Sequence, residues 1–149
     1  MPIRCEHAQP VRATPAQAFA MIDDLSSYAR WLPPCVSLSK VGSGPNAVGD
    51  QLRYVYRDRQ GGPQREMAGE VVARVPGERF HTRYTDAAFV VDVDLRVAPA
   101  AEGALTTHIV EIAPKSVVGR LFSPLIKLGL NKQTRDAATN LARLLDGGA

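Results

Sequence analysis

The side chains best suited to acid–base or metal chemistry in this chain are three histidines, which lie far apart in the sequence. His7, His81 and His108 fall in three different segments, each of which is predicted to be a β-strand. None has a histidine or cysteine partner at the spacing of a metal-binding helix or a zinc motif. No phosphate-binding glycine loop or nucleophile elbow occurs either. The sequence therefore predicts no metal site and no cofactor.

The predicted strand at 105–112 offers two ways to place a titratable group inside the protein. Side chains alternate between the two faces of a strand, so only one of its two sets points inward. If the odd-numbered positions point inward, Glu111 does so, and if the even-numbered positions do, His108 does. An apolar interior would shift the pKa of either group, as is typical of a general acid or base. His108 and Glu111 are the candidate catalytic residues, and the alternative is an inward group near the strand end that reaches water.

Aromatic side chains gather on one face of the predicted strands, at Tyr54, Tyr56, Tyr84 and Phe89. Each alone could be ordinary core, but together they could line a pocket whose phenols hold the polar ends of an apolar ligand. On the predicted last helix, Gln133 could bond to a ligand or to a strand backbone. The arginines of the strands fall mostly on the opposite face, which is typical of a solvated surface: Arg53, Arg57, Arg74, Arg83 and Arg96.

The N-terminal elements that must position these groups have clear boundaries. Residues 3–12 are predicted to form a strand. Thr14-Pro15-Ala16-Gln17 then has the pattern of a capping box that begins a helix. A second short helix, capped by Ser26 or Ser27, is predicted to end at Pro33-Pro34, because a residue before proline is pushed out of the helical region.

The rest of the chain changes from helical period to period 2 and back again. From residue 36 to residue 112, short alternating segments separated by turns predict an antiparallel meander. Residues 117–122 are predicted to form a short helix that is broken at Pro124. Pro124–Asp146 then carries the apolar stripe of a helix of roughly 35 Å at 1.5 Å per residue. A helix of that length can cover the apolar face of a sheet.

The composition is that of an ordinary globular protein, with 45% hydrophobic and 22% charged residues among 149. A net charge of +3 without a dense basic run does not indicate a nucleic-acid partner. Cys5 and Cys35 are expected to be buried thiols in a reducing compartment. Arg120 and Lys127 interrupt the most apolar window, which is shorter than the about 20 residues that span a bilayer. We expect one cytoplasmic domain, residues 1–149, without a transmembrane segment.

Several short stretches carry a resemblance that covers nearly the whole chain: Ala13–Phe19, Asp24-Leu25, Tyr28–Pro33, Gly69–Val71, Pro76–Phe80, Thr106-Thr107 and Gly119–Phe122. On these stretches the chain resembles the START-like helix-grip superfamily, in its SRPBCC branch of polyketide cyclase/dehydrase-like proteins. The resemblance implies an α+β fold. A curved antiparallel sheet of about seven strands would wrap around the long C-terminal helix, with two short helices between strands 1 and 2.

The same resemblance implies a cavity between the sheet and the long helix that binds or transports a hydrophobic small molecule, such as a lipid, a quinone or a polyketide-like compound. The alternative that it implies is a cyclase or dehydratase that uses an inward His108 or Glu111 with a tyrosine. Tyr28-x-x-Trp31-Leu32-Pro33-x-Cys35 with Ser39-x-Val41 also resembles the coenzyme-Q-binding subgroup, which adds a quinone as a secondary idea. A third hypothesis is that the apolar region Val117–Leu130 docks another chain.

Eleven residues are predicted to contact the ligand: Trp31, Tyr54, Tyr56, Met67, Tyr84, Phe89, Val91, Phe122, Ile126, Leu130 and Gln133. Trp31, the single tryptophan, could either plug the core or form the rim of the pocket. The chain is compatible with a monomer or a homodimer.

Overall fold

Seven strands and four α-helices follow one another in the computed structural model, which describes residues 2–57 and 61–147. The first half contains β1 (Ile3–Val11), α1 (Pro15–Asp23), a 3₁₀ turn η1 (Leu25–Ser27), α2 (Tyr28–Trp31), β2 (Cys35–Lys40) and β3 (Gln51–Arg57). The second half contains β4 (Gln64–Val75), β5 (Arg79–Thr85), β6 (Phe89–Ala100), β7 (Gly103–Pro114), α3 (Val117–Leu121) and α4 (Ser123–Gly147).

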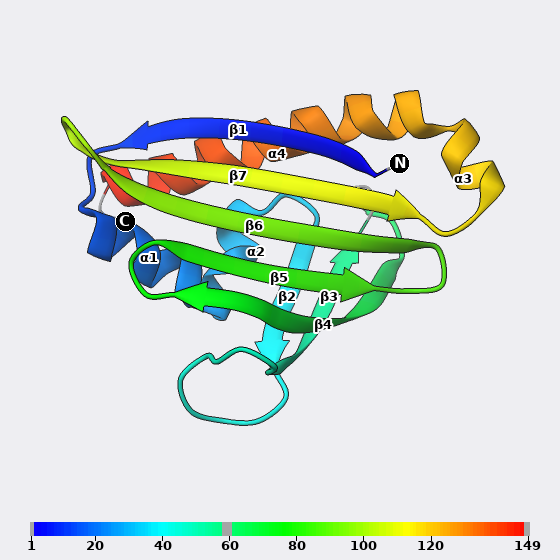
Figure 1. Ribbon diagram of the computed structural model, residues 1–149, viewed down its shortest axis with the longest axis horizontal. Helices are drawn as coiled ribbons and strands as arrows, with labels where there is room; N and C mark the ends of the chain where they lie inside the picture. Colours follow the sequence, from blue (N-terminus) through cyan, green and yellow to red (C-terminus); the bar gives the residue numbers. More distant parts are fainter. Residues whose placement is uncertain (1, 58–60, 148–149) are drawn as a thin grey trace.

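The seven strands form one antiparallel sheet in the order β1-β7-β6-β5-β4-β3-β2. Strands β2 to β7 are a meander in which each strand pairs with the next, and β1 completes the sheet beside β7. The sheet curves, and α4 runs along β1 and β7 (Figure 1). This arrangement confirms the predicted helix-grip fold, with its short helices between the first two strands.

The N-terminal capping box is formed as predicted. The amide of Gln17 donates to Thr14 Oγ1 at 3.1 Å, and the amide of Thr14 donates to Gln17 Oε1 at 3.0 Å. The predicted serine side-chain cap of the next helix is not formed: Ser27 occupies the N-cap position of α2 without a capping bond, and Asp24 caps the preceding η1 by accepting the amide of Ser26 at 3.1 Å. Ser27 is unavailable as a cap, since its hydroxyl donates to the carbonyl of Met21.

The predicted break near Pro124 is confirmed. Ser116 caps α3 by accepting the amide of Gly119 at 3.0 Å. The helix ends at Leu121, and α4 begins at Ser123 with Pro124 in its first turn, where a missing N–H costs nothing. The two helices therefore meet at an angle at one end of the molecule (Figure 1).

The C-terminal half of α4 is the part that reaches the core. Its buried side chains are mostly small, and alanines 137, 138 and 142 allow its backbone to approach the structure around it closely. Leu141 is fully buried among them. The large side chains of the core come from the sheet and the short helices, including Phe80, Leu95 and Ile22.

A bulge in β4 changes which residues of that strand face inward. The register shifts between Val71 and Ala73, so alternation is lost beyond this point. Arg74, predicted on the solvated face, lies inward, where its guanidinium donates to Asp23 of α1 at 2.8 and 2.9 Å. Its Cζ also lies 5.6 Å from the ring centre of Phe19. Val75, which unbroken alternation from Val71 would place inward, is 43% exposed for the same reason.

Both cysteines are free and buried, as predicted. Burial raises the pKa of Cys35 to about 12, so its thiol is unreactive at neutral pH. Among the helices of the described residues, none combines the length and apolar character that a membrane span requires.

Candidate functional site

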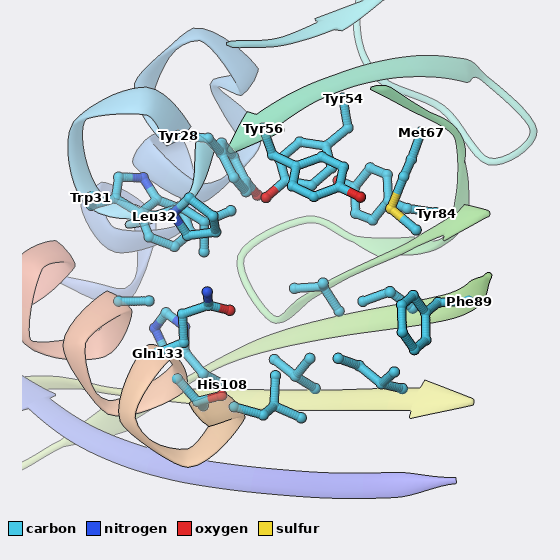
Figure 2. A pocket seen from close by; sticks show the side chains of 18 residues that line it. Tyr28, Trp31, Leu32, Tyr54, Tyr56, Met67, Tyr84, Phe89, His108 and Gln133 are labelled. Atoms are coloured by element: carbon cyan, nitrogen blue, oxygen red, sulfur yellow. The ribbon is translucent and has the colours of Figure 1, made fainter. Parts of the chain in front are cut away.

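A cavity of about 210 Å³ lies between the inner face of the sheet and α4 (Figure 2). It is lined from α2 and its exit, from strands β3 to β7 and from α4: Tyr28, Trp31, Leu32, Pro34, Tyr54, Tyr56, Met67, Tyr84, Phe89, Val91, Val93, His108, Val110, Ile112, Leu130, Gln133, Thr134 and Ala137. Nine of the eleven predicted ligand contacts lie in this wall, and their role in binding stays a prediction.

The structure does not bring the other two predicted contacts to the cavity. Phe122, the residue after the last of α3, is 53% exposed. Ile126 faces the sheet one turn before Leu130, where it packs against a small cluster with Ile3 and Cys5. Both residues have the helical spacing of the pocket-lining stripe, but they lie too near the start of α4.

The pairing of β7 with β1 and β6 settles which candidate acid–base group points inward. His108 is 2% exposed and lines the cavity. Glu111 lies on the opposite face, where Oε1 is 3.4 Å from Nε of Arg4. Glu111 is therefore not a residue of this cavity, and the even-numbered positions of the strand face α4.

His108 packs against apolar and aromatic side chains of the cavity wall. Its ring stands edge-on to Trp31, with 5.7 Å between ring centres and 84° between the planes. Burial, with a smaller contribution from His7 on β1, lowers the pKa of His108 to about 4. The imidazole is therefore neutral at pH 7. Among the described residues, Nε2 has no hydrogen-bond partner although it is buried.

Two polar side chains of α4, Gln133 and Thr134, line the cavity together with this histidine. Thr134 Oγ1 is the other buried side-chain atom without a partner in the described part of the chain. Gln133 is half-buried, and its amide points from α4 into the cavity near His108 (Figure 2). A buried polar atom without a partner costs about 1–3 kcal/mol, which a ligand that bonds to it would recover.

The opposite wall of the cavity is aromatic. Tyr54 is stacked on Tyr56, with ring centres 5.2 Å apart and planes at 10°, and Tyr84 tilts against Tyr54 at 5.0 Å. Gly69 makes room for this wall, because a Cβ at that position would lie 2.6 Å from Cδ1 of Tyr84. Burial raises the pKa of Tyr84, so the phenol stays protonated and can donate.

The aromatic residues of α2 expose only their apolar surfaces to the cavity. The hydroxyl of Tyr28 donates to the carbonyl of Ile22 at 2.6 Å, and Trp31 Nε1 donates to Ser27 Oγ at 3.1 Å. Asn140 of α4 fixes the segment further by donating to the carbonyl of Trp31 at 3.2 Å. Trp31 is 1% exposed, so it is a buried wall of the cavity rather than an exposed rim.

The sequence analysis missed several lining residues that the two-residue repeat of the strands or the helical repeat of α4 would have predicted. Val93 follows Val91 on the same face, and Val110 and Ile112 follow His108. Thr134 and Ala137 lie one helical turn beyond Leu130 and Gln133 respectively. Tyr28, Leu32 and Pro34 had no such signal, because a short irregular segment gives no period.

The wall of the cavity, as far as the structure describes the chain, contains no aspartate, glutamate, lysine or arginine, and its histidine is neutral at pH 7. Elsewhere in the described residues, no three His, Cys, Asp or Glu side chains are placed to hold a metal ion. The site can therefore supply hydrogen bonds and apolar contact, and it offers no charged group to a ligand.

Comparison with known families gives a match over residues 2–146, to the family described as polyketide cyclase / dehydrase and lipid transport. The chain belongs to this family. Members of the polyketide cyclase / dehydrase and lipid transport family differ in activity, so the family supports hydrophobic ligand binding or cyclase-type chemistry without choosing between them. A comparison with curated proteins found no match.

Solved structures share the fold at low sequence identity. A START superfamily protein from Mycobacterium smegmatis superposes with a TM-score of 0.79 at 15% identity, covering 98% of this chain and 99% of that one. A protein from Thermus thermophilus gives 0.77 at 15%, covering 100% and 99%. The di-domain ARO/CYC StfQ from the steffimycin biosynthetic pathway gives 0.76 at 11%, covering 99% of this chain and 51% of that protein. At such identities these likenesses show the fold alone.

Proposed function

We propose that this protein binds an uncharged, largely apolar small molecule in the cavity, with a hydrogen-bonding group of the ligand directed at His108, Gln133 and Thr134. The observation that carries the proposal is a pair of buried polar atoms without partners among the described residues, His108 Nε2 and Thr134 Oγ1, in a wall that has no charged side chain. A carboxylate or phosphate buried there would have no cation to offset its desolvation.

The size of the cavity favours a compact ligand. At about 210 Å³ it is smaller than the roughly 300–1,000 Å³ of most small-molecule pockets. One or two rings with a carbonyl or hydroxyl group suit this volume and the aromatic wall of Tyr54, Tyr56 and Tyr84. A quinone or a polyketide-like ring fits this class, whereas two acyl chains of a phospholipid do not.

An enzyme of the cyclase or dehydratase kind is the second candidate, and the site supports it less well. The unpaired His108 in the cavity is the observation in its favour. A histidine whose pKa is about 4 is a weak general base at pH 7, and a tyrosine whose pKa is raised by burial, as in Tyr84, is a weak general acid. Both shifts favour hydrogen bonding over proton transfer.

The experiment is a binding titration with 1,4-naphthoquinone as an uncharged probe and 2-naphthoate as an anionic probe of similar shape. Because Trp31 lines the cavity, quenching of its fluorescence reports occupancy, and calorimetry checks the result. We expect the neutral probe to bind and the anionic probe to bind at least about tenfold more weakly, a difference of about 1.4 kcal/mol.

Variants then locate the polar contact. His108→Leu together with Thr134→Val should weaken the neutral probe about tenfold or more, because each removes a hydrogen bond. Arg83→Ala, on the other face of the sheet, is the matched control and should leave binding unchanged. Equal binding of both probes, or no effect of the double variant, would contradict the proposal. Conversion of a poly-β-keto substrate that is lost in His108→Ala would favour the enzyme instead.

A further inference from the structure

The surface of α3 and the start of α4 carries a group of exposed apolar side chains that the cavity does not use. Six large residues are between 53% and 74% exposed, and we name them the α3–α4 apolar surface: Val117, Val118, Leu121, Phe122, Leu125 and Leu128. Single exposed apolar residues are ordinary, but a contiguous group on adjacent helical turns is typical of an interaction site.

Helical geometry explains why these residues are exposed together. Leu125 and Leu128 are three residues apart, so they share one side of α4, and Leu121 is exposed at the end of α3 just before it. Leu130 and Ile126 occupy the other side of α4 and pack toward the cluster with Ile3 and Cys5. The start of α4 thus has two apolar sides. One packs against the sheet, and the other is exposed.

The same segment is strongly basic. Residues 115–135 contain five cations and no aspartate or glutamate: Lys115, Arg120, Lys127, Lys132 and Arg135. Lys132 pairs with Asp136 at 2.7 Å, outside that range. Arg120 and Lys127 lie among the exposed apolar residues and form no ion pair with any residue that the structure describes. Apolar residues flanked by unpaired cations fit a partner that is both apolar and anionic.

From this combination we infer that the α3–α4 apolar surface docks on a lipid bilayer that contains anionic lipids. Apolar side chains enter the region between head groups and acyl chains, and the cations bind the anionic head groups. A second copy of the chain fits less well, because a two-fold contact through this surface would bring Arg120 and Lys127 of both copies together.

The docking surface adjoins one end of the cavity. Pro114 at the end of β7 pairs with Phe89, which lines the cavity, and the amide of Lys115 donates to the carbonyl of Ala88 at 2.8 Å. Phe89 lies at the end of the cavity away from His108 (Figure 2). A docked protein would therefore hold this end near the bilayer, which is where an apolar ligand would enter. This step rests on the proposed function, whereas docking itself does not.

Co-sedimentation with vesicles tests the docking surface. The full chain is mixed with vesicles of phosphatidylcholine alone or with about one-third phosphatidylglycerol. We expect binding to the anionic vesicles that weakens as salt is added, and at least about tenfold weaker binding to phosphatidylcholine. Leu121→Ser with Leu125→Ser should reduce binding to anionic vesicles about tenfold or more, and Arg120→Glu with Lys127→Glu should do the same.

Two control pairs keep the number and type of changes equal. Val41→Ser with Val48→Ser removes exposed apolar residues elsewhere, which are 69% and 63% exposed. Arg30→Glu with Arg143→Glu reverses exposed charges on α2 and on the C-terminal part of α4, outside the α3–α4 apolar surface. Neither pair should change vesicle binding by more than about twofold, and all four pairs should keep the unfolding midpoint of the parent chain.

Three results would overturn the inference. The first is an absence of binding to anionic vesicles by the parent chain. The second is equal loss of binding in the test and control pairs. The third is a dimer in vesicle-free sedimentation that the Leu121→Ser and Leu125→Ser pair converts to a monomer, which would assign the surface to a second copy. Failure of the naphthoquinone titration would leave these results standing, because vesicle binding is measured without ligand.

Discussion

The inner and outer faces of the sheet are built from alternate residues of the same strands, but they differ in whether their polar groups are paired. On the outer face of β5 and β6, charged groups are paired: Asp94 accepts Arg79 at 2.9 and 3.0 Å and Arg96 at 2.9 Å, and Asp92 accepts Arg83 at 2.9 Å. On the inner face, His108 Nε2 is buried without a partner among the residues that the structure describes. The same holds for Thr134 Oγ1 on α4, which covers this face.

The pKa values of the two faces reflect this difference. Burial alone would raise the pKa of Asp94, but hydrogen bonds from Arg79 and Arg96 outweigh it and hold the pKa below its usual value. Burial lowers the pKa of His108, and Nε2 has no hydrogen bond from the described residues that would oppose this shift. Asp92 and Asp94 of the outer face are therefore paired within the sheet, whereas the inner side leaves two buried polar atoms unpaired among the described residues, which is typical of a binding site.

The largest effect should come from the closely packed part of the inner face. Phe80 on β5 is fully buried in the main core cluster. Phe80→Ala should lower the free energy of unfolding by about 3–5 kcal/mol, since the ring leaves a void that the rigid sheet does not fill. Urea denaturation measures this. A loss below about 1 kcal/mol would contradict the close packing of the inner face.

The next effect is a pH dependence that belongs to His108. Its folded pKa of about 4 lies below the ordinary value of 6.5, so between these values the unfolded chain takes up a proton that the folded chain excludes. Stability should be full above pH 6.5 and fall by about 3 kcal/mol as the pH drops to about 4.

His108→Leu tests this assignment. The variant should lose that part of the slope, while its stability at pH 7 should equal or exceed that of the parent chain, because an unpaired buried polar atom is removed. Denaturation midpoints across the pH range provide the comparison. An unchanged slope in the variant would show that another group carries the pH dependence.

Two adjacent residues of β4 compare the faces directly. Gly69→Ala should cost about 1–3 kcal/mol, because its new methyl group would lie 2.6 Å from the ring of Tyr84. The displaced ring would narrow the cavity, so binding of naphthoquinone should weaken as well. Ala68→Val is the control, since Ala68 is exposed on the outer face and should tolerate the larger side chain. Similar losses of unfolding free energy in both variants would contradict the difference in packing between the inner and outer faces.

The smallest effect should come from the ion pairs of the outer face. The side chain of Arg83 is 41% exposed where it meets Asp92. Arg83→Ala should therefore cost about 0–1 kcal/mol and less at high salt, because water and ions screen an exposed pair. Denaturation at two salt concentrations measures both. A loss comparable to that of Phe80→Ala would mean that the outer network holds the sheet together.

The candidate site could be predicted from the sequence only where a period was unbroken. The pattern of β6 placed Phe89 and Val91 in the wall correctly, because nothing interrupts its alternation. The same reasoning failed for Arg74, because one extra residue at a bulge reverses every later position. Phe122 failed for another reason: an apolar stripe shows which side of a helix is apolar, but not how far the sheet extends beneath it.

Local chemistry was enough to predict where two of the helices begin. Thr14 with Gln17 begins a helix and Pro124 separates two helices, since capping and a missing N–H act within one turn. The choice between His108 and Glu111 depended on long-range pairing. Alternation allows either face of β7 to point inward. Pairing with β1 and β6, together with the packing of α4 on one face, determines that the face with His108 is buried. The cavity likewise exists only because residues distant in sequence close around it.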